Sequence, residues 1–394
     1  MSVTVVHAAD LHIDSPLRGL TRYQGAPHEA VAKATRTAFE KLVDLCLERA
    51  ASVLLLAGDL FDGAWRDFNT GLFFLAEINR LRAVGCKVVL LRGNHDAQSV
   101  IERKLTLPEH AFELTTHGPQ VIRFEDLGVS VTGQGFATRA ILTDLAAGYP
   151  RPDPHEFSIA LLHSSLDGRE GHDAYAPSKL STLLDKGYGY WALGHVHKRE
   201  DVHPTVVFPG NLQGRHARET GPKGVMVLEV DDVSLKSREF VALDVVRWEH
   251  LHVDVGEAQS LHDVLDLASA AIDDASAEDE ERVHALRVTL EGKTSLPLAR
   301  DPEALLAELR GRALGRPVYV EKLRFATQRQ DERGAHPLEP YLVQVAAELG
   351  AEATLLLGEL PTEIADEVRL LLGEDERLVG DALRYVSSKL QGGD

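Results

Sequence analysis

The stretch Val53-Leu54-Leu55-Leu56-Ala57-Gly58-Asp59-Leu60-Phe61-Asp62 joins a short apolar run to a polar cluster through a glycine. A continuously apolar run of five residues, bounded by a glycine, predicts a strand that is buried on both faces. Carboxylates directly after a buried strand are costly unless they bind a partner. The stretch therefore predicts an α/β protein with a polar site at the carboxyl end of a strand.

The same arrangement, a predicted strand followed by metal-binding side chains, recurs four more times in the first half of the chain. The four further motifs are Asp10-Leu11-His12, Gly93-Asn94-His95-Asp96, a lone His163, and Gly194-His195-Val196-His197. Together the five motifs supply enough carboxylate, amide and imidazole groups for two divalent cations. Because adjacent metal pairs recur in enzymes that break phosphate esters, the sequence predicts a two-metal phosphoesterase site.

Amphipathic helices alternate with the predicted strands. Helices are expected over His28–Ala50 and Asp67–Val84, where apolar residues recur every three or four positions. The predicted strands are Val3–Ala8, Val53–Ala57, Lys87–Leu91, Val121–Phe124, Val129–Thr132, Ser158–Leu162, Tyr190–Leu193, Val206–Phe208 and Val225–Val230. This alternation favours two sheets packed face to face with helices outside, which is an α/β sandwich.

A second unit is expected from about Leu251. Predicted strands and helices alternate there as Leu251–Val255, Ser260–Ile272, Ala285–Glu291, Pro302–Arg312 and Pro317–Phe325. A charged linker over Gln328–His336 precedes a largely helical remainder. We therefore expect a metallophosphoesterase domain over residues 1–245, a small α+β domain over 251–326, and a helical C-terminal segment over 337–394.

Composition favours a cytoplasmic protein with no membrane partner. No apolar run approaches the roughly 20 residues that span a bilayer, and the first residues lack a basic, apolar leader. Cys46 and Cys86 lie in apolar contexts, which indicates buried thiols. The net charge of −19 is unevenly distributed. Residues 1–250 carry 32 acidic and 27 basic side chains, a net of −5, and residues 251–394 carry 29 and 15, a net of −14.

Residues beside the motifs suit further steps of hydrolysis. A hydroxide shared by two metals is a nucleophile at neutral pH, and we expect it to attack phosphorus. His95 is not needed as a ligand and is adjacent to Asn94, so it is the expected proton donor to the leaving oxygen. Asp62 or Asp96 could orient a ligand imidazole.

Each motif alone has a simpler explanation. Asp10 could end a strand, and a lone His163 is more often a polar core residue than a ligand. All five motifs in this order favour the metal site over those explanations. The other histidines, including His7, His172 and His216, are expected to be structural or exposed. Ligands without thiolate favour manganese, iron or zinc.

The chain resembles the SbcD-type double-strand-break repair nucleases within the calcineurin-like metallophosphoesterases, and most of all their bacterial YhaO branch. The metal motifs are shared by the whole superfamily. Asp14-Ser15-Pro16-Leu17, Asn211-Leu212-Gln213-Gly214-Arg215 and Glu219-Thr220-Gly221-Pro222-Lys223-Gly224 point to the narrower branch. The resemblance covers residues 1–240 well and the remainder only by layout.

The resemblance implies a nuclease dependent on two divalent ions, with Mn²⁺ favoured. One ion would be held by Asp10, His12 and His197, the other by Asn94, His163 and His195, with Asp59 bridging. It also implies 3′-to-5′ exonuclease and single-strand endonuclease activity on DNA ends in double-strand-break repair, a homodimer, and an SMC-like ATPase partner. The second unit would then be a capping domain, and the C-terminal segment would dock on the ATPase. Some relatives carry histidine in place of Asp62, which weakens a proton-relay role for this residue.

A rival interpretation is a small-substrate metallophosphodiesterase or phosphatase that does not act on DNA. The Leu91-Arg92-Gly93-Asn94-His95 run is phosphatase-like, but the Asp-Arg-Gly continuation of phosphoprotein phosphatases is replaced by Asp62-Gly63-Ala64. A non-enzymatic scaffold is disfavoured because every expected ligand is present. Basic residues near the motifs could meet DNA phosphates, although ordinary surface charge explains each of them equally well: Arg66, Arg92, Arg103, Lys104, Arg215, Arg218 and Lys223.

Overall fold

The computed structural model describes residues 2–17, 20, 28–62, 68–98, 106–168, 175–231, 233–277 and 282–329. The described chain divides into two units. The first comprises the described residues of Met1–Glu249, Asp279–Ala285 and Pro317–Glu321, and the second the described residues between and after these segments. The predicted helical segment 337–394 lies outside the described residues.

The first unit contains a six-stranded sheet of order β12-β11-β1-β2-β3-β4. Its strands are β1 (Val3–Ala8), β2 (Val53–Ala57), β3 (Lys87–Leu91), β4 (Ala111–Glu113), β11 (Gly224–Val230) and β12 (Leu235–Ala242). The strands β1 to β4 pair in parallel, whereas β11 is antiparallel to both β1 and β12. The carboxyl ends of β1, β2 and β3 therefore meet at one edge of the sheet.

A second six-stranded sheet has the order β5-β6-β7-β8-β10-β9. Its strands are β5 (Gln120–Phe124), β6 (Val129–Gly133), β7 (Phe157–His163), β8 (Tyr190–Gly194), β9 (Glu200–His203) and β10 (Val206–Phe208). The strands β6, β7, β8 and β10 are parallel. His163 lies opposite Gly194 in this register, so the ends of β7 and β8 also lie together.

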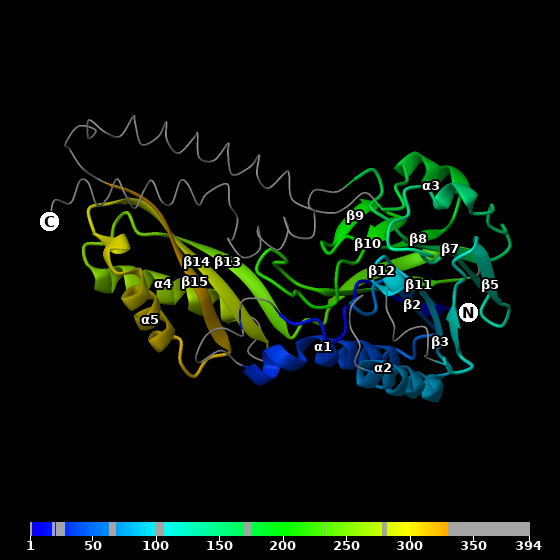
Figure 1. Ribbon diagram of the computed structural model, residues 1–394, viewed down its shortest axis with the longest axis horizontal. Helices are drawn as coiled ribbons and strands as arrows, with labels where there is room; N and C mark the ends of the chain where they lie inside the picture. The colour runs from blue at the N-terminus through cyan, green and yellow to red at the C-terminus, as the bar shows by residue number, and fades with distance from the viewer. Residues whose placement is uncertain are drawn as a thin grey trace. The chain divides into compact units, whose positions relative to one another are not determined.

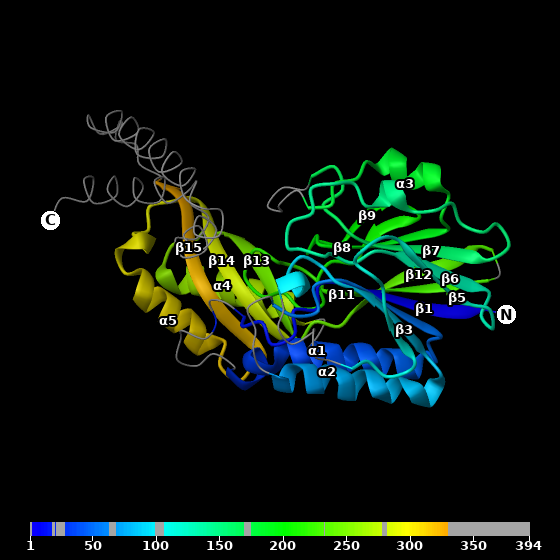
Figure 2. The same ribbon diagram turned by 45° about the vertical axis from the view of Figure 1, so that its right-hand side comes forward.

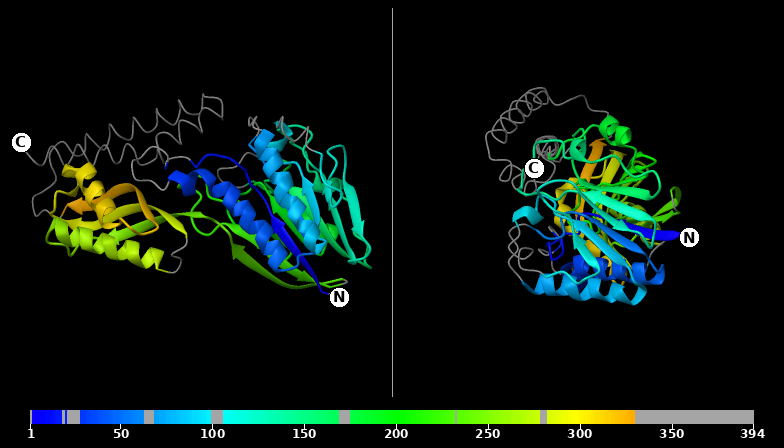
Figure 3. Two further views of the ribbon diagram at one scale, coloured as in Figure 1. Left: turned by 90° about the horizontal axis from the view of Figure 1, so that it is seen from below. Right: turned by 90° about the vertical axis from the view of Figure 1, so that its right-hand side faces the viewer.

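The alternation of side chains along the strands explains the layers. In β2, Leu54 and Leu56 pack against the helices α1 (His28–Glu48) and α2 (Phe68–Arg80), while Val53 and Leu55 pack against the second sheet. A short helix, α3 (Leu180–Lys186), covers the outer face of the second sheet. Figure 1 shows α1 and α2 side by side along one sheet and α3 beyond the other, and the end-on view in Figure 3 shows the same layers.

The second unit is a small α+β arrangement. It contains most of the three-stranded sheet β13-β14-β15, whose strands span Val246–Asp254, Val283–Thr294 and Val318–Arg329. The helices α4 (Leu261–Ser276) and α5 (Pro302–Arg312) run alongside this sheet (Figure 2). Ser260 and Asp263 form a capping box that begins α4, and the Asp301 side chain caps α5.

The predicted fold class, a two-sheet α/β sandwich, is confirmed. Every strand predicted in the first unit is present, most of them within one residue of the predicted limits. Three strands were not predicted, namely β4, β9 and β12, and α2 ends at Arg80, where a short 3-10 turn over Leu81–Val84 takes over. Cys46 and Cys86 are buried as expected. Among the described helices, none has the length and apolar character needed to cross a bilayer.

Candidate metal centre

Loops at the carboxyl ends of the central strands gather the predicted ligands. Asp10, His12, Asp59 and His195 all have positive φ values, of 51°, 42°, 53° and 98°. Residues other than glycine rarely adopt this backbone conformation, which costs about 1 kcal/mol or more per residue. Such residues are concentrated at functional sites. Backbone bonds hold the first two loops together: the amides of Asp10 and His12 donate to the carbonyls of Gly58 and Asp59, each at 3.0 Å.

Two glycines allow the loops to approach each other. A Cβ on Gly93 would lie 2.2 Å from Asp59 Oδ1, and one on Gly194 would lie 1.9 Å from the Ala57 carbonyl oxygen. Neither distance is possible for real atoms, so no other residue fits without movement of the loops. The glycines that precede Asn94 and His195 are therefore required for the backbone to bring these ligands in.

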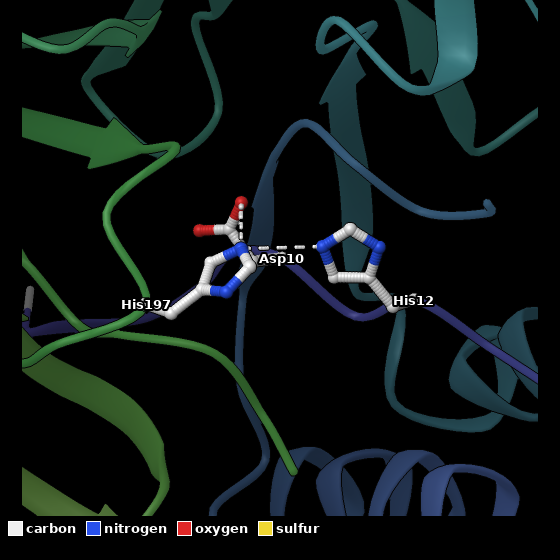
Figure 4. Close-up of side chains that lie close together, drawn as sticks. All are labelled: Asp10, His12 and His197. Atoms are coloured by element: carbon white, nitrogen blue, oxygen red, sulfur yellow. Dashed lines mark hydrogen bonds and ion pairs between the residues drawn. The ribbon is translucent and has the colours of Figure 1, made fainter. Parts of the chain in front are cut away.

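The first group of candidate ligands is Asp10, His12 and His197, shown in Figure 4. His12 Nε2 lies 3.3 Å from His197 Nε2, which in turn lies 3.8 Å from Asp10 Oδ1. Each imidazole is anchored through its other nitrogen. His12 Nδ1 donates to Asp62 Oδ1 and His197 Nδ1 to Glu219 Oε1, both at 2.7 Å. Since a carboxylate only accepts, both Nε2 atoms of the neutral rings carry lone pairs that face each other.

The second group is Asp59, His163 and His195, with Asn94 beside them. His163 Nδ1 donates to the Ala57 carbonyl oxygen at 2.9 Å, which leaves a lone pair on Nε2 of the neutral ring. That Nε2 lies 2.9 Å from Asn94 Oδ1 and 3.4 Å from Asp59 Oδ2. Asp59 Oδ2 also lies 4.0 Å from His12 Nε2, so this carboxylate stands between the two groups.

The donor chemistry of both groups fits divalent cations. Lone pairs on imidazole nitrogens and carboxylate or amide oxygens converge within a few ångströms in a buried setting, which is repulsive unless a positive charge lies between them. These two groups also each combine side chains from both sheets. Asp10, His12, Asp59 and Asn94 follow strands of the first sheet, whereas His163, His195 and His197 lie on or after β7 and β8 of the second.

The electrostatics of the centre favour added positive charge. Burial, together with the nearby Asp59 carboxylate, raises the pKa of Asp10 to about 8. Burial alone would lower the pKa of His163, but the charges of Asp59 and Asp10 raise it to about 9. Burial opposes ionisation of Asp59, yet the surrounding histidines hold its pKa well below the usual value. These pKa shifts indicate that the buried carboxylates of the site attract positive charge, either as protons or as metal ions.

His95 and Asp62 lie at the edge of the first group. His95 is 41% exposed, and its ring meets that of His12 edge to face at 5.0 Å between centroids. Its Nδ1 lies 3.8 Å from Asp62 Oδ1. Although burial opposes ionisation, the bond from His12 and the charge of Arg215 hold the pKa of Asp62 far below its usual value. The same carboxylate thus faces a candidate ligand and the expected proton donor.

Asp96 has a different environment from Asp62. Its carboxylate accepts hydrogen bonds from the backbone amides of Leu60, Phe61 and Gly93, at 3.0–3.1 Å. Burial, and next the charge of Asp59, raises the pKa of Asp96 to about 6. Asp96 therefore fixes the backbone of two ligand-bearing loops, whereas of the two predicted carboxylates it is Asp62 that holds an imidazole.

Two residues of the centre, Glu219 and Arg215, are not predicted from the sequence to act at the metal ions. Glu219 is buried and accepts a hydrogen bond from His197, and Arg215 reaches Asp62 Oδ1 at 3.4 Å and Glu219 Oε1 at 3.6 Å. Burial alone would raise the pKa of Glu219, but Arg215 and His197 hold it well below the usual value. The signal for them in the sequence is the Asn211–Gly224 stretch, which resembles the narrower branch of the family.

The remaining basic residues and histidines singled out in the sequence have separate environments. Lys223 is buried and donates to the His197 carbonyl oxygen at 2.8 Å, Arg92 pairs with Glu113, and Arg218 is exposed. His7 is buried, and His216 lies 3.6 Å from Glu219 Oε1. Arg66, Arg103, Lys104 and His172 lie outside the described residues.

Two families match the chain. The calcineurin-like phosphoesterase family matches residues 3–199, which contain the five predicted ligand motifs. The middle domain of metallophosphoesterase YhaO matches residues 248–328.

Individual proteins resemble the chain over longer stretches. The uncharacterized metallophosphoesterase YhaO of Bacillus subtilis is 32% identical over 349 residues, which are 86% of this chain and 85% of that protein. The DNA double-strand break repair protein Mre11 of Methanopyrus kandleri is 28% identical over 61% of this chain and 57% of its own length. Among solved structures, a dimetal phosphatase from Danio rerio aligns with a TM-score of 0.35 at 11% identity, over 61% of this chain and 97% of that one.

Proposed function

The chain belongs to the calcineurin-like metallophosphoesterases and is thus a metal-dependent hydrolase; from that premise we propose that it is a two-metal nuclease acting on DNA ends in double-strand-break repair. One observation carries the chemical part of the proposal: two neighbouring groups of buried or partly buried side chains bring potential ligand atoms close together, with Asp59 between the groups. This arrangement suits adjacent cations and the ester hydrolysis that such pairs perform.

The proposal assigns the residues as follows. Asp10, His12 and His197 would hold one divalent ion, Asn94, His163 and His195 the other, and Asp59 would contact both. When bound, the ions would lower the pKa of a water molecule and neutralise charge on the phosphate. His95, exposed beside the first group, would protonate the leaving oxygen. Asp62 would orient His12 and His95, and Asp96 would hold the loops that carry Asp59 and Asn94.

The choice of DNA as substrate is supported by the relatives. Two proteins named DNA double-strand break repair protein Mre11 match part of this chain. The one from Methanopyrus kandleri is 28% identical, and the one from Saccharolobus solfataricus is 26% identical. We extend to this chain the 3′-to-5′ exonuclease and single-strand endonuclease activities that its resemblance to that group implies. The same resemblance is the ground for proposing Mn²⁺ as the metal, a homodimer, an SMC-like ATPase partner and a cytoplasmic location.

The domain assignment is part of this proposal. Residues 1–245 would form the nuclease domain, and residues 251–326 the capping domain that guides DNA. The match of the YhaO middle domain to residues 248–328 supports a distinct unit there. The segment 337–394 would dock on the ATPase.

A nuclease assay tests the proposal directly. Purified protein with Mn²⁺ should shorten an end-labelled linear duplex from its 3′ ends and nick a single-stranded circle, while His163→Ala should do neither. The same preparations should be tested on a chromogenic phosphodiester. Hydrolysis of the small ester without cleavage of either DNA would reject the nuclease and favour the small-substrate phosphoesterase.

A further inference from the structure

We propose that Glu219 is a positioning residue that fixes the proton of His197 on Nδ1 and so keeps Nε2 available to the first metal ion. The inference rests on the proposed two-metal centre but not on the identity of the substrate. It assigns a role to the Asn211–Gly224 stretch, which the proposed catalytic steps leave unused. Figure 4 shows His197 Nε2 directed towards Asp10 and His12, which is the direction that the proton must avoid.

Two groups compete for His197 Nδ1. Glu219 Oε1 lies 2.7 Å from this nitrogen and can only accept, whereas Arg215 Nη2 lies 3.3 Å from it and can only donate. A bond to Glu219 requires the proton on Nδ1. A bond to Arg215 would require a bare Nδ1, and the neutral ring would then carry its proton on Nε2, towards Asp10 and His12. The shorter distance to Glu219 decides the tautomer.

Both oxygens of Glu219 are occupied, which holds the carboxylate in place. Its Oε2 accepts from Asn211 Nδ2 at 2.9 Å and from the Arg215 backbone amide at 2.6 Å, while Oε1 serves His197. Only 7% of the residue is exposed, so water competes little for these bonds. A carboxylate with two donors on one oxygen and an imidazole on the other has one orientation available.

The same device occurs at the other imidazoles that are anchored through Nδ1. Asp62 accepts from His12 Nδ1, and the Ala57 carbonyl oxygen accepts from His163 Nδ1. When the ring is neutral, each of these acceptors leaves Nε2 without a proton on the side of the candidate ions. Such outer partners of metal-binding histidines typically change metal affinity about 10–100-fold when they are removed.

Glu219→Gln is the informative variant because it preserves shape but supplies only one accepting oxygen. If the amide nitrogen faces His197, it donates to Nδ1 and moves the proton to Nε2. If it faces the other way, it opposes the donors of Asn211 and Arg215. The matched control is Glu229→Gln, which changes the same residue type on β11, where the carboxylate accepts from the Ser2 and Thr4 hydroxyls.

The experiment has two readouts, and neither uses catalysis. Calorimetric titration of the full-length metal-free protein with Mn²⁺ should give two binding steps in the wild type and in Glu229→Gln. In Glu219→Gln one step should weaken about 10–100-fold while the other stays within about twofold. Long-range ¹⁵N spectra of the metal-free protein, with the His197 signals identified by their loss in His197→Gln, should report Nδ1–H in the wild type and Nε2–H in Glu219→Gln.

The outcomes separate this inference from the proposed function. A wild type that binds fewer than two Mn²⁺ ions would refute the two-metal centre. Two ions in the wild type with both steps unchanged, or both equally weakened, in a folded Glu219→Gln would refute the role of Glu219. Should that variant fail to fold, the wild-type spectrum alone decides, because Nε2–H on His197 would contradict the inference.

Discussion

At the scale of single residues, the centre depends on where protons lie. Three histidines of the centre, His12, His163 and His197, each give the Nδ1 proton to an oxygen on the outer side of the site. His95 differs because its side chain is partly exposed and its Nδ1 lies 3.8 Å from the Asp62 carboxylate. It can therefore exchange protons with solvent and substrate, which suits an acid more than a ligand.

His95→Ala should lower kcat about 10²–10⁴-fold while leaving Mn²⁺ affinity within about threefold. The backbone amide of residue 95, which donates to Asp59 Oδ1 at 2.9 Å, survives the substitution and keeps the bridging carboxylate in place. Single-turnover nuclease kinetics and a parallel metal titration measure both effects. His155→Ala, at an exposed position, is the control, and full activity of His95→Ala would remove this residue from the chemistry.

His7 makes the metal-free protein sensitive to acid. Its Nε2 donates to the Leu193 carbonyl oxygen and its Nδ1 accepts from the Tyr190 hydroxyl, both at 3.1 Å, in the core between the sheets. Burial lowers the pKa of His7 from 6.5 to about 3. Below pH 6.5 the imidazole of His7 binds a proton in the unfolded chain but not in the folded protein. The contribution of His7 to the free energy of unfolding is therefore fully present above pH 6.5 and is lost as the pH falls towards 3.

The prediction is a slope of up to about 1.4 kcal/mol per pH unit from this one group. Urea unfolding of the metal-free protein between pH 7 and pH 4 measures it. His7→Gln should flatten the decline, whereas His155→Gln should follow the wild type. Parallel curves for the wild type and His7→Gln would show that His7 is not the sensitive group.

At the scale of elements, the central strands of the two six-stranded sheets were predictable, whereas three of their four edge strands, β4, β9 and β12, were not. β2 is an unbroken apolar run and β3 is apolar after its first residue, Lys87, so their limits follow from sequence. By contrast, half of the residues in β9 and in β12 are charged or exposed, as is common in edge strands because it discourages pairing with other chains, and such mixed sequences resemble loops. The three-residue β4 is too short to show a period.

The residues of the site also divide into those that the sequence predicts and those that it does not. Ligands that directly follow an apolar strand, such as Asp59 and Asn94, could be predicted because a local motif marks them. The contact between Glu219 and His197 depends on the course of the chain between these two residues, which are 22 positions apart, and no local pattern specifies it. Sequence could also not decide between Asp62 and Asp96 as partner of an imidazole, since both flank ligand motifs and only the folded loops separate their contacts.

Gly194→Ala tests the packing of the loops. The new Cβ would lie 1.9 Å from the Ala57 carbonyl oxygen, so the ends of β8 and β2 must separate. We expect a loss of roughly 2 kcal/mol or more in stability, together with weaker binding of both metal ions. Thermal unfolding and a Mn²⁺ titration measure these. Gly118→Ala is the control because a Cβ there meets nothing within 4 Å; equal behaviour of the two variants would contradict the prediction.

At the scale of the whole molecule, metal binding and folding should be coupled. The buried carboxylates and lone pairs of the centre repel one another without a cation, and that repulsion is present only in the folded protein. Ions that bind only the folded state stabilise it by about 2.7 kcal/mol at one hundred times their Kd. Differential scanning calorimetry should therefore show a higher Tm with Mn²⁺ than with EDTA, and a Tm that ignores Mn²⁺ would contradict the two-metal assignment.

Both candidate ion sites draw side chains from each of the two sheets. The alignment of one sheet over the other is therefore a catalytic parameter, set by apolar contacts such as those of Leu55, Ile159 and Ala192 between the layers. A small slip between the layers would stretch both coordination shells at once. Substitutions deep in that interior, far from any reacting atom, should then reduce turnover and cation retention in parallel, and would be mistaken for active-site changes if only rates were recorded.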